Sequence, residues 1–259
     1  MHSANQPGYK PRRPAWSAVA TRMCADHVAQ AHVCIVTAAC LLMNAPAVTA
    51  ATRAWTGGGE PSYSWTNAAN WGGTLPDFND GDGSVDAVIF SNIANNAATT
   101  LDGDKTVNSI RFSSLDYTNY SIDGNMLTIK TGALTRDASS GRSTQTINSD
   151  IILGADAIWN INGNNSTASI VRVNGSIGDG GNGYGLTMTG ARVLRLYGDN
   201  TYSGPTIFDI GAGSGSFLLN GSNATCAIYN RSSAALASMT INGICTLATS
   251  VTFSAGRTL

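Results

Sequence analysis

The densest group of side chains that could bind a metal ion lies between Asp77 and Asp86, in the segment DFNDGDGSVD. Four side chains with amide or carboxylate oxygens lie within it, and Ca²⁺ prefers such ligands. These are Asp77, Asn79, Asp80 and Asp82. An EF-hand loop, however, needs a glycine at its sixth position after the alternating ligands, and no register of the segment supplies one. The pattern favours an Asx-rich turn before a strand, and we predict no metal site.

Three tryptophans near the start of the segment that follows residue 50 could form a platform on which sugar rings stack. They are Trp55, Trp65 and Trp71. The same side chains could instead close the open apolar end of a repeat fold, where unpaired strands would otherwise be exposed. We predict this structural cap. Further candidates for glycan contacts are the tyrosines Tyr184, Tyr197 and Tyr202.

The sequence offers few residues that could act as a catalytic acid and base. Glycosidases need two converging carboxylates, and polysaccharide lyases combine a basic residue with acidic calcium ligands. The chain has one glutamate, Glu60, and seven of its 15 aspartates adjoin glycine or asparagine, as turn residues do. Arg172, Arg192 and Arg195 could line a concave face, but no carboxylate cluster accompanies them in the sequence. We predict no catalytic residue and no cofactor; a carbohydrate-active enzyme, either a polysaccharide lyase or a glycosidase, is the alternative.

Residues 1–50 have the organisation of a signal peptide. A basic region precedes the uncharged apolar run from Val33 to Met43, and small residues that fit cleavage after Ala50 follow it. The alternative is an N-terminal membrane anchor, but the run is shorter than the roughly 20 residues that a span needs. The start of translation could be Met1 or Met23. We therefore predict an exported protein, extracellular or on the outer cell surface, with no membrane span after signal removal.

Removal of this segment changes the available chemistry. It takes away all three histidines, which excludes a Ser–His–Asp triad, a Cys–His pair and histidine-containing zinc sites. It leaves Cys226 and Cys245, which either form a disulfide or remain buried free thiols. The segment holds four of the 15 basic and one of the 16 acidic residues, so the remaining chain has a net charge of −4. This balance gives no basic surface for nucleic acid.

The elements that must position these residues are short strands. Only 12% of the residues are charged, and 29 glycines accompany many Asn, Ser and Thr residues, a composition typical of an all-β fold with many turns. Within the apolar runs, Ile110 and Phe112 share a face opposite Arg111. The runs recur at intervals of 19–22 residues, through Ile89, Ile110, Ile129, Ile151 and Val171.

The intervals indicate how the strands are assembled. Beyond Leu194 they fall to 10–13 residues, about half the earlier value, through Ile207, Leu218, Ile228 and Ile241. A unit of about twenty residues that carries two or three strands is typical of a solenoid. A β-sandwich of seven or more short strands is the competing fold. We predict the solenoid because the period is nearly constant.

The segment Thr189–Thr206, TGARVLRLYGDNTYSGPT, resembles the autotransporter-associated β-strand repeat. The residues that match the repeat motif are Gly190, Leu194, Leu196, Gly198, Asn200, Thr201, Tyr202, Gly204 and Thr206. Ile177–Leu186 resembles the glycine-rich lead-in to that motif, and Trp55–Phe90 resembles the Trp-rich opening that precedes such repeats in secreted bacterial proteins. The resemblance implies a right-handed parallel β-helix of the autotransporter passenger type, and it implies no catalytic residues. It fades after Phe217, so we expect a shortened member or a fragment of a longer protein.

These observations predict a signal peptide over 1–50, a Trp-rich N-terminal cap segment over 51–90 and β-helix repeats over 91–259. The predicted function is that of an exported, non-enzymatic structural scaffold or adhesin. Its expected partners are surface glycans or extracellular matrix, bound through many weak polar contacts rather than in one deep pocket. The sequence leaves the oligomeric state open.

Overall fold

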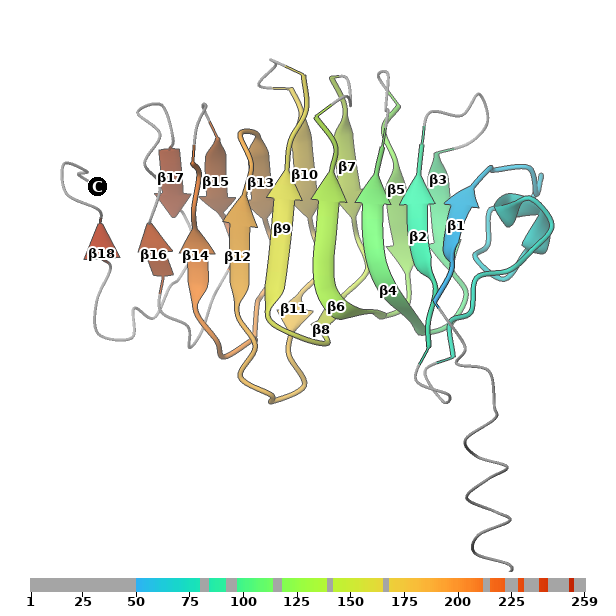
Figure 1. The fold of residues 1–259 in the computed structure, drawn as a ribbon, viewed down its shortest axis with the longest axis horizontal. Coiled ribbons are helices and arrows are strands. Elements are labelled where there is room, and N and C mark those ends of the chain that lie inside the picture. Colours follow the sequence, from blue (N-terminus) through green and yellow to red (C-terminus); the bar gives the residue numbers. More distant parts are fainter. Residues whose placement is uncertain are drawn as a thin grey trace, which may run out of the picture. The chain divides into compact units, whose positions relative to one another are not determined.

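The computed structural model describes residues 50–79, 84–91, 97–113, 118–138, 142–164, 168–211, 215–221, 228–230, 238–241 and 252–253. In this part the chain is all-β apart from one short 3-10 helix, η1 (Ala68–Trp71), and its strands form two sheets (Figure 1). The 11-stranded sheet contains β1 (Thr52–Trp55), β2 (Ala87–Phe90), β4 (Lys105–Phe112), β6 (Leu127–Arg136), β8 (Ile151–Leu153), β9 (Ala157–Ile161), β11 (Ile177–Gly178), β12 (Leu186–Thr189), β14 (Thr206–Phe208), β16 (Ile228–Asn230) and β18 (Thr252–Phe253). The 7-stranded sheet contains β3 (Ala98–Leu101), β5 (Ser121–Gly124), β7 (Thr144–Ile147), β10 (Ile170–Val173), β13 (Val193–Leu196), β15 (Ser216–Leu219) and β17 (Ser238–Ile241).

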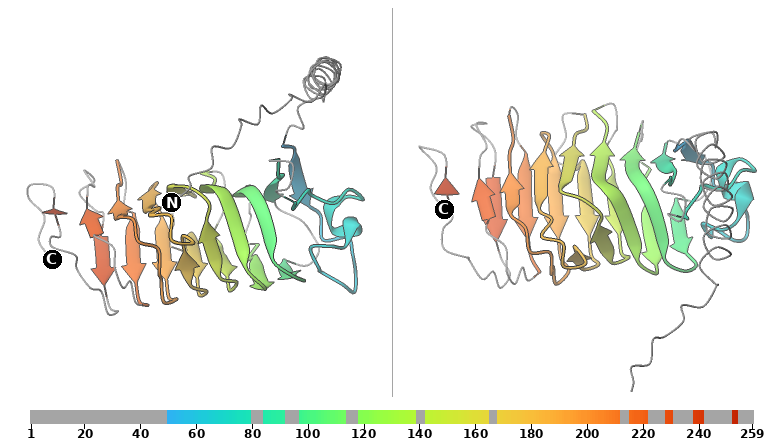
Figure 2. Two further views of the ribbon diagram at one scale, coloured as in Figure 1. Left: turned by 90° about the horizontal axis from the view of Figure 1, so that it is seen from below. Right: turned by 60° about the horizontal axis from the view of Figure 1, so that its bottom comes forward.

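Every pairing between the described strands is parallel. From β2 onward the chain passes back and forth between the two sheets, so that neighbours within a sheet come from successive turns of the chain (Figures 1 and 2). The fold is therefore a parallel β-solenoid, as predicted. The competing β-sandwich is wrong, since its strands would pair in antiparallel fashion.

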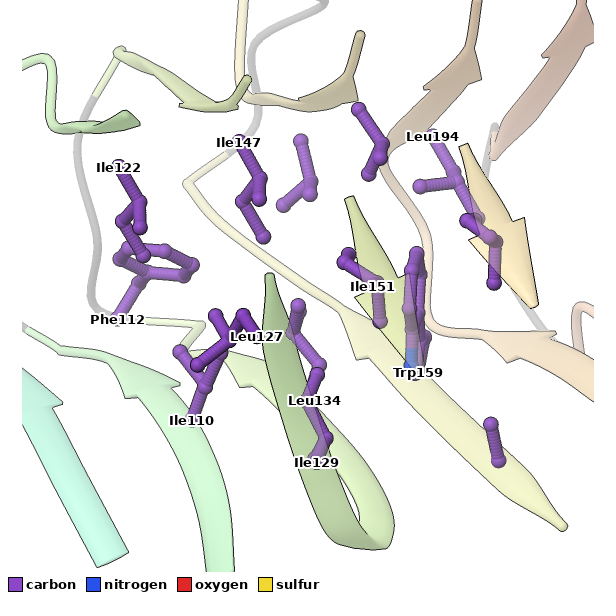
Figure 3. Packing of buried hydrophobic residues seen from close by; sticks show 14 of the residues in the cluster. Ile110, Phe112, Ile122, Leu127, Ile129, Leu134, Ile147, Ile151, Trp159 and Leu194 are labelled. Atoms are coloured by element: carbon purple, nitrogen blue, oxygen red, sulfur yellow. The ribbon is translucent and has the colours of Figure 1, made fainter. Parts of the chain in front are cut away.

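The period-two alternation of apolar residues places the core between the sheets. Ile110 and Phe112 are buried while Arg111 is exposed, which confirms the predicted faces of this strand. Side chains from both sheets converge in the interior (Figure 3). One buried row runs in register across the first sheet through Val88, Ile110, Leu134, Trp159, Met188 and Phe208.

The register corrects the interval predicted from the sequence. Val88 pairs with Ile110, 22 residues further on, whereas Trp159 pairs with Met188, 29 residues further on. The longer step contains β11 and the glycine-rich segment that follows it. Ile89 pairs with the outward-facing Arg111, so the predicted step from Ile89 to Ile110 compared residues on opposite faces. The half-length steps after Leu194 are confirmed, because those apolar residues alternate between the two sheets.

The middle coils have a short third face. Strand β6 pairs with β8 through Leu127–Ile129 and with β9 through Ala133–Arg136. Gly132 lies between the two halves with φ +66°, a conformation that side chains other than glycine rarely adopt. A Cβ atom there would also lie 2.8 Å from the Ala155 carbonyl oxygen. This glycine lets one strand serve two faces of the solenoid.

A row of glycines follows the strands of the second sheet and sets how closely the coils approach there. Cβ atoms built at Gly175, Gly198 and Gly221 would lie 2.1, 2.1 and 2.0 Å from the carbonyl oxygens of Ser149, Gly175 and Gly198, respectively. Each glycine therefore packs directly on the backbone of the preceding coil. The repeated Asn-Gly at 174–175 and 220–221 was a signal in the sequence for this contact.

We predict that Gly198→Ala lowers the free energy of unfolding by about 1–3 kcal/mol, because the added methyl group forces two backbones apart. Gly211→Ala is the matched control, since a Cβ atom at Gly211 meets nothing within 4 Å. Urea unfolding of both variants measures the difference. Equal stabilities would show that the close approach at Gly198 does not constrain the fold.

Candidate functional site

The three tryptophans predicted as a cap form one buried cluster. Their side chains are 0–4% exposed, and the ring centroids of Trp71 lie 5.0 Å from Trp55 and 5.4 Å from Trp65, both edge to face. Trp65 Nε1 donates a hydrogen bond to Thr99 Oγ1 over 2.9 Å, and Trp71 Nε1 donates to the Trp65 carbonyl over 2.8 Å. Buried rings offer no open face to a sugar, so the cluster does not provide the stacking platform considered above.

The position of the cluster is consistent with a cap. Trp55 ends β1, which pairs only with β2 among the described strands. The segment that carries Trp65 contacts the outermost strand of the other sheet, through the backbone bond from the Trp65 N–H to the Thr100 carbonyl. Asn70 fixes the loop, because its buried side chain accepts from the Gly59 N–H and donates to two carbonyls. Capping itself remains a prediction.

The described part of the predicted acidic turn is structural. Asp86 is 4% exposed; its carboxylate accepts from the Ala51 and Asp77 N–H groups and pairs with Arg53 at 2.9 Å. Burial alone would raise the pKa of Asp86, but these hydrogen bonds lower it below its usual value. Asp77 accepts from the Asn79 N–H, as in the predicted Asx turn. Asp80 and Asp82 lie outside the described residues, as do Cys226 and Cys245.

The residues of the predicted repeat motif have distinct structural roles. Leu194 and Leu196 enter the core, while Asn200, which is 1% exposed, accepts from the Ile177 N–H of the preceding coil through its Oδ1 over 3.1 Å. Tyr202 is buried and its hydroxyl lies 2.6 Å from Thr206 Oγ1. The backbone N–H groups of Thr201 and Tyr202 both donate to the Ile177 carbonyl.

The remaining motif residues are glycines at close approaches. A Cβ atom at Gly190 would lie 2.5 Å from the Ile161 carbonyl oxygen, and Gly190 has φ +86°. A Cβ atom at Gly204 would lie 2.4 Å from the Gly185 nitrogen. The motif thus encodes coil-to-coil packing, and among its side chains only that of Thr201 is exposed.

One buried carboxylate joins the glycine-rich lead-in to the motif. Asp179 is 3% exposed and accepts from the N–H groups of Gly181 and Gly183. It also accepts from Ser203 in the next coil, from the backbone N–H at 3.1 Å and from Oγ at 2.8 Å. Burial alone would raise the pKa of Asp179, but the hydrogen bonds, those from Ser203 and Gly181 above all, lower it to about 2. In the sequence Asp179 looks like the other aspartates beside glycine, so this role was not predicted.

A shallow depression of about 360 Å³ lies on the outer face of the first sheet, over β9, β12 and β14. Ile158, Thr187 and Ile207 occupy adjacent register positions in it, and Ile158 is 59% exposed. Asp156, at the edge, accepts from the Gly185 N–H over 2.9 Å. Together these residues could contact an apolar surface, whereas a single carboxylate here could not act as a paired acid and base.

The three arginines considered for chemistry do not form one group. Arg172 and Arg195 occupy the same register position on β10 and β13. Arg192 instead donates to the carbonyl groups of Asn164 and Ala191 and so holds the coil corner. In the described part of the chain, no group of three or more His, Cys, Asp or Glu residues could hold a metal ion. That part also contains no helix long and apolar enough to cross a membrane.

We predict that Trp65→Ala lowers the free energy of unfolding by about 3–5 kcal/mol, through lost burial and the lost bond to Thr99. If the cluster is a cap, the variant also exposes the strand edges and self-associates. Leu75→Ala, at a side chain that is 41% exposed, is the control from the same segment. Chemical unfolding and light scattering measure both effects. A destabilised variant that stays monomeric would contradict the capping role.

We predict that Asp179→Asn lowers the free energy of unfolding at pH 7 by about 1.5–3 kcal/mol, since hydrogen bonds to a charged acceptor are lost. The pKa of Asp179 is lowered from 3.8 to about 2, so its stabilisation is present above about pH 4 and is lost as the pH falls toward 2. Unfolding free energies between pH 2 and pH 7 should therefore vary less steeply in the variant. The half-buried Asp209 supplies the control, Asp209→Asn. If the free energy of unfolding of Asp179→Asn varied with pH as steeply as that of the wild type, Asp179 would not be the group responsible.

The chain matches no protein-family model, no curated protein sequence and no solved structure with which it was compared.

Proposed function

We propose that this β-solenoid is an exported protein of the extracellular space or outer cell surface, where it acts as a structural scaffold or adhesin. The proposal extends the resemblance to the autotransporter-associated repeat, with its right-handed passenger fold and leading signal peptide. It takes the Trp-rich segment as a cap. Surface glycans or extracellular matrix are the proposed partners.

The observation that carries the proposal is the arrangement of outward-facing side chains in straight rows. On the first sheet, Thr135, Asn160 and Thr189 follow one another in register on successive coils. On the second sheet, Ser121 and Thr146 do the same. Adjacent strands lie about 4.8 Å apart, so each row repeats small hydrogen-bonding groups at a fixed spacing. Such a surface suits an extended polymer that makes many weak contacts.

Packing between coils supports a mechanical role for the solenoid. Asp150, Asp156 and Asn119 each accept a hydrogen bond from a backbone N–H of the following coil. Asn174 donates to Asn148 Oδ1 over 2.6 Å, which joins equivalent corners of two coils. These hydrogen bonds connect the corners of successive coils, just as the main-chain hydrogen bonds connect the strands. They lie at the corners and so leave the faces of the solenoid flat.

We predict that the purified chain binds members of a panel of polysaccharides and matrix proteins weakly as a monomer. Displayed on beads, it should bind at least about a hundredfold more strongly, because many weak contacts then act together. Retention assays with monomer and beads measure the ratio. Failure to bind any member would contradict the adhesin role. Release of shortened oligosaccharides from a polysaccharide would instead favour the enzyme alternative.

A further inference from the structure

Two arginines stand side by side on the outer face of the second sheet. Arg172 and Arg195 are register partners on β10 and β13, between Thr146 on β7 and Leu218 on β15. Each arginine lies between buried residues along its strand, so its side chain projects from the outer face of the sheet. Adjacent strands are about 4.8 Å apart, which places the two side chains next to each other.

These arginines lack acidic partners of the kind that Arg111 and Arg53 have. Arg111 pairs with Asp137 at 2.7 Å, and Arg53 pairs with Asp86 at 2.9 Å. Within the described part of the chain, neither Arg172 nor Arg195 forms an ion pair or a hydrogen bond. Like charges placed opposite each other on neighbouring strands are destabilising. The pair therefore leaves an uncompensated positive charge on a chain whose formal net charge is −1.

The surroundings of the pair suit a sugar polymer. The Arg172 guanidinium lies over the half-buried Tyr197 ring, 5.6 Å from its centroid, and a tyrosine combines an apolar ring with a polar tip. Tyr197 lies just beyond the end of β13, where its N–H bonds to the Val173 carbonyl. The exposed Asn174 and Asn148 follow the two preceding strands of that sheet, and they supply amide groups that could bind hydroxyls. Cations, amides and an aromatic ring thus share one strip.

We propose that this strip, formed by Arg172, Arg195 and Tyr197, binds an acidic polysaccharide through the carboxylates of its uronic acid units. The proposal rests on the adhesin function and names the chemistry of its partner. A guanidinium presents two parallel donors that match the two oxygens of a carboxylate. Two arginines are too few for nucleic acid, whose binding proteins carry extended basic surfaces and a high pI.

The test measures the affinity of the purified full chain for polygalacturonate. Arg172→Gln with Arg195→Gln should weaken binding about tenfold or more, and wild-type binding should weaken as NaCl is added. Arg172→Lys with Arg195→Lys keeps the charge but loses the forked geometry of the guanidinium. Its affinity should therefore lie between that of the wild type and that of the double glutamine variant. The double glutamine variant should unfold at the same temperature as the wild type or at a higher one, because like-charge repulsion is removed. The matched control, Arg111→Gln with Lys130→Gln, removes the same charge from the first sheet and should keep wild-type affinity.

Several outcomes would overturn the inference. A control variant that weakens binding as much as the Arg172 and Arg195 variant would show that only net charge matters. Equal binding of single-stranded DNA would assign the strip to polyanions in general, and tighter binding of dextran sulfate would assign it to sulfate esters. If the double glutamine variant binds polygalacturonate as tightly as the wild type does, the adhesin function stands and this inference fails. If the wild type binds no polymer at all, the adhesin function itself fails.

Discussion

The fold depends on main-chain hydrogen bonds between one coil and the next. A coil of 20–29 residues cannot bury enough apolar surface to offset the loss of backbone entropy, so each coil needs neighbours on which to stack. Parallel pairing supplies the backbone partners of the inner strands and places Val88, Ile110, Leu134 and Trp159 in one continuous row of core side chains. The period of the sequence follows from that requirement, because each coil must return its strand to the same register.

The corners carry most of the specific chemistry. Strands need only alternating apolar residues, but corners must satisfy backbone groups that leave the ladders. Asp179 and Asn200 do so with side-chain oxygens that accept N–H groups of an adjacent coil. Gly175 and Gly198 have a different role at the corners, because they allow direct contact between two backbones. The Asp, Asn and Gly residues at these corners are thus parts of one packing scheme.

The sequence predicted the solenoid and the inward faces of its stronger strands, because alternation such as that of Ile110 and Phe112 reports burial directly. It did not predict β3 and β5, whose buried positions include only Thr99, Leu101 and Ile122 and whose other residues are polar or small. Nor could it place Arg172 beside Arg195. That register depends on the length of the corner segment between the two strands, and corner segments vary, as the 29-residue step to Met188 shows. Patterns of burial are local, whereas register is set by the whole coil.

The parallel register of successive coils is the claim on which the rest depends, and nuclear Overhauser effects between backbone protons test it most directly. We expect cross-peaks between Leu134 and Trp159 and between Trp159 and Met188, in the pattern of parallel strands. Strong contacts between opposed Hα protons across these segments would contradict it, since close Cα pairs of that kind belong to antiparallel sheets.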